Sequence, residues 1–180
     1  MIVRIATVAD ARSIAEVHVA SWQVAYRGQV PDDYLDGLSV DVRESAWTRI
    51  LAHTGWPEGT LTFVLVDEEL SIEEGTHGRT LGFANLGPSR DEDADAKTGE
   101  LRSIYLDSVS WGEGYGRMLM SEAMRTLQSW GCRVAIVWVL DTNARARRFY
   151  EAAGWYADGA EKVDESRGFS LREVRYRSSL

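Results

Sequence analysis

The sequence predicts a single α/β domain built around a mixed sheet, and three observations support this. Its 180 residues suit one domain and are enough to bury a sizeable core. Apolar runs typical of strands alternate with segments whose apolar residues recur at helical spacing. No internal repeat, linker or boundary divides residues 1–180, so we expect one domain.

Helix-start signals organise the N-terminal half. Thr7 and Asp10 have the spacing of a capping box, Pro31 is suited to the first turn of a helix, and Ser39 is a good N-cap. Two β-branched, apolar runs then indicate strands. The expected strand, three helical segments and two further strands lie over residues 3–6, 7–26, 31–38, 39–51, 60–67 and 80–86.

Two polar, acidic stretches are expected to be connections, over residues 68–77 and 87–99. A run of charges such as the second stretch is usually a solvated turn, and we predict that here. The C-terminal half is more regular. Gly131 and Gly154 stand where helices should end. The expected elements alternate as strand, helix, strand, helix and two closing strands, over residues 100–106, 115–130, 134–140, 143–153, 155–164 and 169–177.

A glycine-rich loop joins the strand ending at Leu106 to the next helix. Gly112, Gly114 and Gly116 occupy alternate positions immediately before the helical pattern. Glycine permits close backbone approach to a ligand, and the first N–H groups of a helix are free to bind an anion. The spacing is neither the dinucleotide pattern G-x-G-x-x-G nor a P-loop, which ends in G-K-[ST]. The loop predicts a pyrophosphate site of another kind.

Composition narrows the function classes. A net charge of −8 and a pI near 4.9 argue against nucleic acid as a partner and are compatible with a cationic substrate or with solubility alone. The N-terminus has no apolar signal region and no run approaches a membrane span, so we expect a cytoplasmic protein without a membrane partner. Cys132 is the only cysteine, which excludes an internal disulfide and a thiolate metal site. Seven tryptophans suggest that some line a cleft.

The segment after the strand at 134–140 identifies the type of site. Asn143, Ala146, Phe149-Tyr150, Gly154 and Trp155 follow that strand in order. Together with the loop Trp111–Gly116, they resemble the GNAT family of acetyl-CoA-dependent N-acetyltransferases. The resemblance implies a mostly antiparallel sheet of about six to seven strands, with helices on both faces and a splay between strands 4 and 5. Trp111 and Glu113 depart from the family pattern, which often has cations there.

The resemblance implies acetyl-CoA as acyl donor and no metal. Pantetheine would pair with the backbone of 104–106, and the loop amides would bind the pyrophosphate. Asn143 would cap its helix and contact the cofactor. The implied cofactor-binding residues are Ile104, Tyr105, Leu106, Trp111, Gly112, Glu113, Gly114, Tyr115, Gly116, Arg117, Asn143 and Tyr150.

Catalytic roles follow from the same resemblance. Acetyl transfer needs a neutral amine, and deprotonating an alkyl ammonium at neutral pH costs about 4.6 kcal/mol. Tyr150 is the expected general acid, with packing as the alternative role. Glu100 is the candidate base, although a strand-edge charge would also explain it. The acceptor pocket is expected to include Trp22, Tyr26 and Tyr34.

The sequence therefore predicts direct transfer of an acetyl group from acetyl-CoA to a primary amine of a small molecule or peptide. A covalent acetyl-enzyme is not expected, because no cysteine lies near the glycine loop. The alternative is a non-catalytic acyl-CoA-binding module of the same fold. The acceptor stays open among polyamines, aminoglycosides, amino acids and peptide N-termini, and family members often form homodimers.

Overall fold

The computed structural model describes residues 1–55, 59–70 and 78–180. Within these ranges the chain forms a seven-stranded sheet of order β1-β2-β3-β4-β5-β7-β6, in which only β4 and β5 are parallel neighbours. The mixed, mostly antiparallel sheet predicted from the sequence is confirmed. The strands are β1 Ile2–Ile5, β2 Leu61–Asp67, β3 Arg79–Pro88, β4 Thr98–Leu106, β5 Val134–Leu140, β6 Tyr156–Asp164 and β7 Leu171–Ser179.

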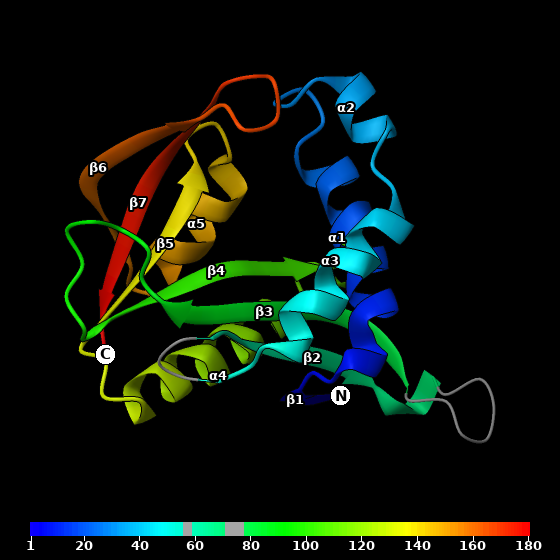
Figure 1. The fold of residues 1–180 in the computed structure, drawn as a ribbon, viewed down its shortest axis with the longest axis horizontal. Helices are drawn as coiled ribbons and strands as arrows, with labels where there is room; N and C mark the ends of the chain where they lie inside the picture. The colour runs from blue at the N-terminus through cyan, green and yellow to red at the C-terminus, as the bar shows by residue number, and fades with distance from the viewer. Residues whose placement is uncertain (56–58, 71–77) are drawn as a thin grey trace.

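Helices cover both faces of the sheet, with α1 to α3 on one face and α4 and α5 on the other (Figure 1). No helix in the described ranges is both long and apolar enough to cross a bilayer. The helices are α1 Ala11–Ala25, α2 Asp32–Asp36, α3 Val40–Ala52, α4 Tyr115–Ser129 and α5 Ala144–Ala152, with 3₁₀ turns η1 Val8–Asp10, η2 Glu68–Leu70 and η3 Ser108–Ser110.

The helix starts follow the predicted capping signals. Asp10 accepts a hydrogen bond from the Thr7 N–H at 2.8 Å, and this box encloses the 3₁₀ turn η1 before α1 begins. The Ser39 hydroxyl accepts from the Val42 N–H at 3.3 Å at the start of α3. The helix expected from Pro31 is shorter than predicted, since α2 ends at Asp36 and Gly37 follows it.

The sheet opens between β4 and β5. The two strands pair only over residues 98–100 and 134–136, although β4 continues to Leu106 and β5 to Leu140. Figure 1 shows them meeting at one end and diverging toward the other. Beyond Glu100, the β5-facing edge of β4 therefore has no neighbouring strand.

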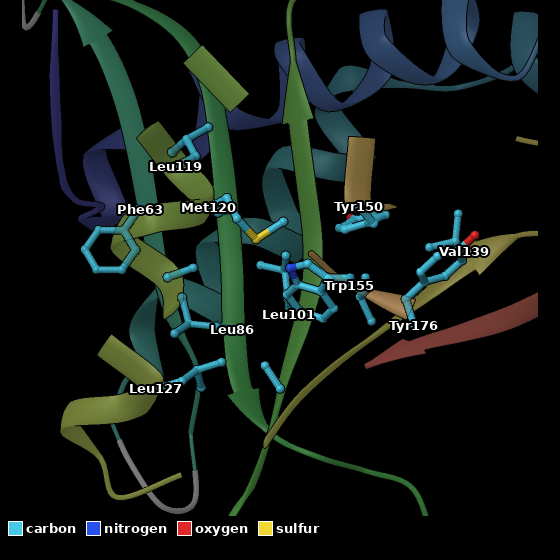
Figure 2. Packing of buried hydrophobic residues seen from close by; sticks show 14 of the residues in the cluster. Phe63, Leu86, Leu101, Leu119, Met120, Leu127, Val139, Tyr150, Trp155 and Tyr176 are labelled. Atoms are coloured by element: carbon cyan, nitrogen blue, oxygen red, sulfur yellow. The ribbon is translucent and has the colours of Figure 1, made fainter. Parts of the chain in front are cut away.

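Alternating side chains build two cores on either side of the sheet. In β2, Phe63 and Leu65 face the cluster beneath α4 and α5, and Val64 faces α1 and α3. Figure 2 shows the first cluster, in which Tyr150 lies among core side chains. Cys132 is buried in the same cluster.

Most residues of the acidic connection between β3 and β4 are exposed, as predicted for a solvated turn, but two of its aspartates also bind the sheet. Arg175 on β7, whose side chain is 7% exposed, binds Asp91 at 2.8 Å and Asp93 at 2.7 Å from the connection, and Asp158 at 2.9 Å from β6. Asp91 also accepts from the Trp138 indole N–H on β5 at 3.0 Å. The acidic residues thus tie β5, β6 and β7 to the start of β4. Most of the other expected connection, 68–77, lies outside the described residues.

Replacing Arg175 with methionine is expected to lower the free energy of unfolding by about 3–5 kcal/mol, because it leaves Asp91 and Asp158 without their buried partner. Denaturant titration of the purified variant measures this loss. Arg177→Met is the matched control, since Arg177 is 30% exposed and binds only the Asp158 side of the network. Equal losses in the two variants would contradict a special role for Arg175.

Candidate active site

A cavity of about 510 Å³ occupies the opening between β4 and β5. Residues 102–106 of β4 and 137–140 of β5 form its walls, and the loop at 111–117 and helix α5 complete it. The structure thus brings the glycine loop and the segment beginning at Asn143 together around one space. These are the two segments that carried the predicted cofactor site.

Two loop glycines adopt a backbone that other residues rarely adopt. Gly112 has φ +91° and Gly114 has φ +84°, and Gly114 is the N-cap of α4. A Cβ on Gly116 would lie 3.2 Å from the Phe149 ring, so this position is tight rather than strained. The Arg117 N–H donates to the Gly114 carbonyl, which leaves the earlier amides of α4 as the free donors of the first turn.

Positive charge surrounds this cavity. Among the described residues, its lining holds four arginines and no carboxylate: Arg102, Arg117, Arg145 and Arg148. Glu113 is exposed and is not part of the lining. The lining thus suits a ligand with several phosphate charges, because no acidic side chain repels it.

Trp111, the unusual first residue of the loop, has a defined structural role. Its indole N–H donates to the Leu106 carbonyl at 3.1 Å, which fastens the loop to the end of β4. The guanidinium of Arg145 lies 3.9 Å from the centre of the Trp111 ring, a cation–π contact that directs this arginine from α5 toward the loop. The cation that the family pattern often places in the loop is therefore supplied by another helix.

Asn143 and Tyr150 lie on opposite ends of α5. The Asn143 side chain accepts from the Ala146 N–H at 3.0 Å, so the predicted helix cap is present, and Asn143 also lines the cavity. Tyr150 is 5% exposed and packs beside Trp155 and Tyr176 (Figure 2). Burial raises the pKa of Tyr150 well above its ordinary value, so the phenol retains its proton at physiological pH.

A second cavity of about 770 Å³ lies under α1 and α3. Six residues line both cavities and form a shared boundary, here called the junction: Tyr26, Arg102, Ser103, Tyr105, Trp138 and Leu140. The hydroxyls of Tyr26 and Tyr105 are 3.5 Å apart there, and burial raises the pKa of both phenols.

The predicted acceptor residues divide between the cavity and the core. Trp22 and Tyr26 line the second cavity. Tyr34 is not in that lining, and its ring packs edge-on against Phe169 at 4.9 Å. The short α2 directs Tyr34 toward the connection between β6 and β7. Tryptophans 22, 47, 111 and 138 do line the cavities, as the composition suggested.

Glu100 lines the second cavity but is occupied by an ion pair. Its carboxylate is 2% exposed and accepts from the Arg90 Nε at 3.0 Å and from a second guanidinium nitrogen of Arg90. Glu100 is also the last β4 residue paired with β5, at the closed end of the opening. In this geometry Glu100 is better suited to hold Arg90 in position than to abstract a proton.

Sequence reasoning missed several charged residues of the second cavity. Arg43, Arg167 and Glu173 come from α3, the β6–β7 connection and β7, and no local motif surrounds them. Arg102 had a structural signal that only the register reveals: it is the extra residue of a β-bulge between β3 and β4. Bulges re-aim side chains and are common beside active sites. No metal-binding group of three His, Cys, Asp or Glu occurs in the described part of the chain.

Comparison with known proteins places this geometry in a family. The model of the acetyltransferase (GNAT) family matches residues 22–155. YuaI of Bacillus subtilis (strain 168), an uncharacterized N-acetyltransferase, is 34% identical over 175 residues, which cover 96% of this chain and 89% of YuaI.

Solved structures share the fold at lower identity. YncA from Salmonella typhimurium, solved with its cofactor acetyl-CoA, has a TM-score of 0.69 and 22% identity, covering 100% of this chain and 94% of YncA. PaiA N-acetyltransferase from Thermoplasma acidophilum, solved with coenzyme A, has a TM-score of 0.66 and 17% identity, with full coverage of both chains. The chain belongs to the acetyltransferase (GNAT) family and is an acyl-CoA-dependent acetyltransferase.

Proposed function

We propose that this protein transfers the acetyl group of acetyl-CoA directly to a primary amine, without a covalent acetyl-enzyme. One observation carries the proposal: the carboxylate-free cavity between β4 and β5 shares a wall with the second cavity, and two half-buried tyrosines, Tyr26 and Tyr105, belong to that wall. The first cavity would hold the donor and the second the acceptor. The relatives solved with coenzyme A and acetyl-CoA support this choice of donor.

The residues of the first cavity fit acetyl-CoA, which supplies an acetyl group activated as a thioester. The loop amides before Arg117 and the lining arginines would hold the phosphates. The backbone of 104–106 pairs with β3 on one side and has no strand on the other, so it is free to pair with the pantetheine arm. Asn143 would contact the same arm from α5.

Tyr150 would protonate the departing thiolate. Its hydroxyl makes no hydrogen bond within the described residues, and its side chain lines the donor cavity. The raised pKa keeps the phenol in the protonated form that an acid requires. Cys132 lines neither cavity and is buried, and burial raises its pKa, so it is unsuited to act as a nucleophile.

Glu173 would accept the proton of the acceptor ammonium, because its ion pair with Lys162, at 3.4 Å, is looser than those of Glu100 with Arg90 and Asp164 with Arg167. Burial and the nearby charges of Arg43 and Arg167 lower the pKa of His18 to about 3, and its Nδ1 accepts from the Trp47 indole. Bonds from Ser166 and Arg167 lower the pKa of Asp164 to about 2. Glu100 is paired with Arg90.

The position of Glu173 supports this assignment. It lies opposite Leu140, the last residue of β5, and its charge raises the pKa of both Tyr26 and Tyr105 at the junction. Its contact with Lys162 is 3.4 Å long and a quarter of its side chain is exposed, so one side of the carboxylate stays accessible. A base placed beside the junction can act on the amine directly or through one water.

The proposal is tested by calorimetry with acetyl-CoA, followed by thiol detection on a panel of primary amines. We expect micromolar binding and amine-dependent release of coenzyme A. Binding without release on any amine would favour a non-catalytic acyl-CoA-binding module. No binding at millimolar acetyl-CoA would exclude both functions.

Glu173→Gln is expected to lower kcat about 10²-fold, with the KM for acetyl-CoA nearly unchanged, because the amine loses its base while the donor cavity is intact. Glu100→Gln should instead lower the melting temperature, since Arg90 loses its buried partner. Glu161→Gln, an exposed position on β6, is the control. A larger loss of kcat in Glu100→Gln than in Glu173→Gln, at equal stability, would return the role of base to Glu100.

A further inference from the structure

We infer that the acceptor is an amine that also carries an oxyanion, in the manner of an amino acid, and that Arg43 and Arg167 bind the oxyanion beside Trp22. The inference rests on the proposed function, because it assigns the second cavity to the acceptor. It concerns the part of that cavity beside Trp22, whose ring packs against Tyr26 of the junction at 4.8 Å.

The second cavity has an excess of positive charge inside an acidic protein. Its described lining contains five cationic side chains and three carboxylates: Arg43, Arg90, Arg102, Lys162 and Arg167 against Glu100, Asp164 and Glu173. Each carboxylate already has a cationic partner from the same lining. The overall charge of −8 is therefore no guide to the substrate, since the negative charge lies elsewhere.

Two of these arginines converge on one ring. The guanidinium carbon of Arg43, from α3, lies 5.7 Å from the centre of the Trp22 ring, and that of Arg167, from the β6–β7 connection, lies 5.4 Å from it. Both charges also act on His18, whose pKa they help to lower.

Of these two arginines, Arg43 is the one without an ion pair among the described residues. It forms no ion pair with any carboxylate in the described ranges, and its contact with Trp22 fixes its direction. Arg167 is held by Asp164, and its segment is anchored where Phe169 packs on Tyr34 of α2. Figure 1 shows this connection reaching across to α2. The two guanidinium groups are thus presented by packed segments from opposite sides of the cavity.

The arrangement matches a small zwitterion better than a polycation. A guanidinium binds carboxylate or phosphate oxygens through paired N–H donors. With the oxyanion at Trp22, the amine would lie toward Tyr26 and Tyr105, where Glu173 acts. A polyamine or aminoglycoside would place further positive charge against Arg43 and Arg167, which disfavours it.

Matched acceptors test the inference. Steady-state assays compare L-amino acids and aminoalkylphosphonates with the corresponding L-amino acid amides and with polyamines. We expect kcat/KM for the best oxyanion-bearing amines to exceed that of their neutral analogues by roughly tenfold to hundredfold. The carboxylate and phosphonate series distinguish the two kinds of oxyanion. Equal use of acids and amides, or preference for polyamines, would overturn the inference while leaving acetyl transfer intact.

Arginine variants locate the site. Arg43→Gln should raise the KM for the acidic acceptor by at least about tenfold and remove its advantage over the amide, with kcat and the KM for acetyl-CoA little changed. Arg43→Lys should restore part of the preference. Arg49→Gln is the control, because Arg49 is exposed on the same helix and lines neither cavity. An unchanged acid-to-amide ratio in Arg43→Gln would exclude Arg43.

A binding measurement separates the two proposals. Calorimetry on the coenzyme A-saturated protein compares a series of N-acetyl-L-amino acids with their amides, in wild type and in Arg43→Gln. The wild-type protein could bind the acids selectively and yet release no coenzyme A with any amine. That pair of results would reject the proposed acetyl transfer and support the oxyanion site. Absence of such binding would reject the oxyanion site.

Discussion

Replacing Tyr150 with phenylalanine is expected to lower kcat for acetyl transfer by about 10²–10³-fold while the Kd for acetyl-CoA stays within about twofold. The substitution removes only the hydroxyl, so the ring contacts with Trp155 and Tyr176 are preserved. The leaving thiolate then has no positioned proton donor. Because burial raises the pKa of this phenol, wild-type activity should show no alkaline decline from Tyr150 below about pH 10.

Tyr156→Phe provides the matched control, since Tyr156 is 54% exposed and belongs to neither cavity. Single-turnover measurements of coenzyme A release isolate the chemical step from product release. Turnover by Tyr150→Phe equal to that of wild type would remove Tyr150 from the acid role and leave it as a packed core residue.

Replacing Gly114 with valine is expected to weaken acetyl-CoA binding by at least about 10²-fold. Gly114 has φ +84°, which a β-branched residue adopts only at a cost of about 1–3 kcal/mol, so the loop is expected to rearrange. Any rearrangement moves the first amides of α4, and these are the donors proposed to bind the phosphates. The loss should appear in Kd by calorimetry, with the rest of the fold retained by circular dichroism.

Gly131 offers a close control at the other end of the same helix. It has φ +81°, and a Cβ there, as at Gly114, would meet no atom within 4 Å. Gly131→Val should therefore cost similar stability without affecting acetyl-CoA binding. If both variants lost affinity equally, the effect would come from general destabilisation of α4 and not from the loop.

Local patterns made much of the fold and donor site predictable. The period of apolar residues, the caps at Thr7 and Ser39, and the glycine before α4 act within a few residues, so they are legible in a single sequence. The donor site is similar, because a continuous loop and one helix supply most of it.

The acceptor site was less predictable because tertiary contacts decide which charges are free. In the sequence Glu100 is a carboxylate at the start of a strand with no partner nearby, whereas in the fold Arg90 is bound to it. Arg43 and Arg167 are more than a hundred residues apart and meet only through Trp22. Tyr34 is an aromatic residue of the kind that can line a pocket, but the short α2 directs it toward Phe169. No spacing rule carries this information.

The network around Arg175 has a mechanical consequence. In the described residues, only three strand-paired positions join the half-sheet ending in β4 to the half-sheet beginning with β5. The two half-sheets therefore meet along a short contact. Asp91, from the connection before β4, accepts a hydrogen bond from Trp138 of β5 and pairs with Arg175 of β7, so it links the two half-sheets. Both cavities are lined by residues of β4 and β5, so the angle between the two half-sheets affects the shape of both. A substitution that loosens these contacts at the closed end of the opening is therefore expected to change the shape of both cavities.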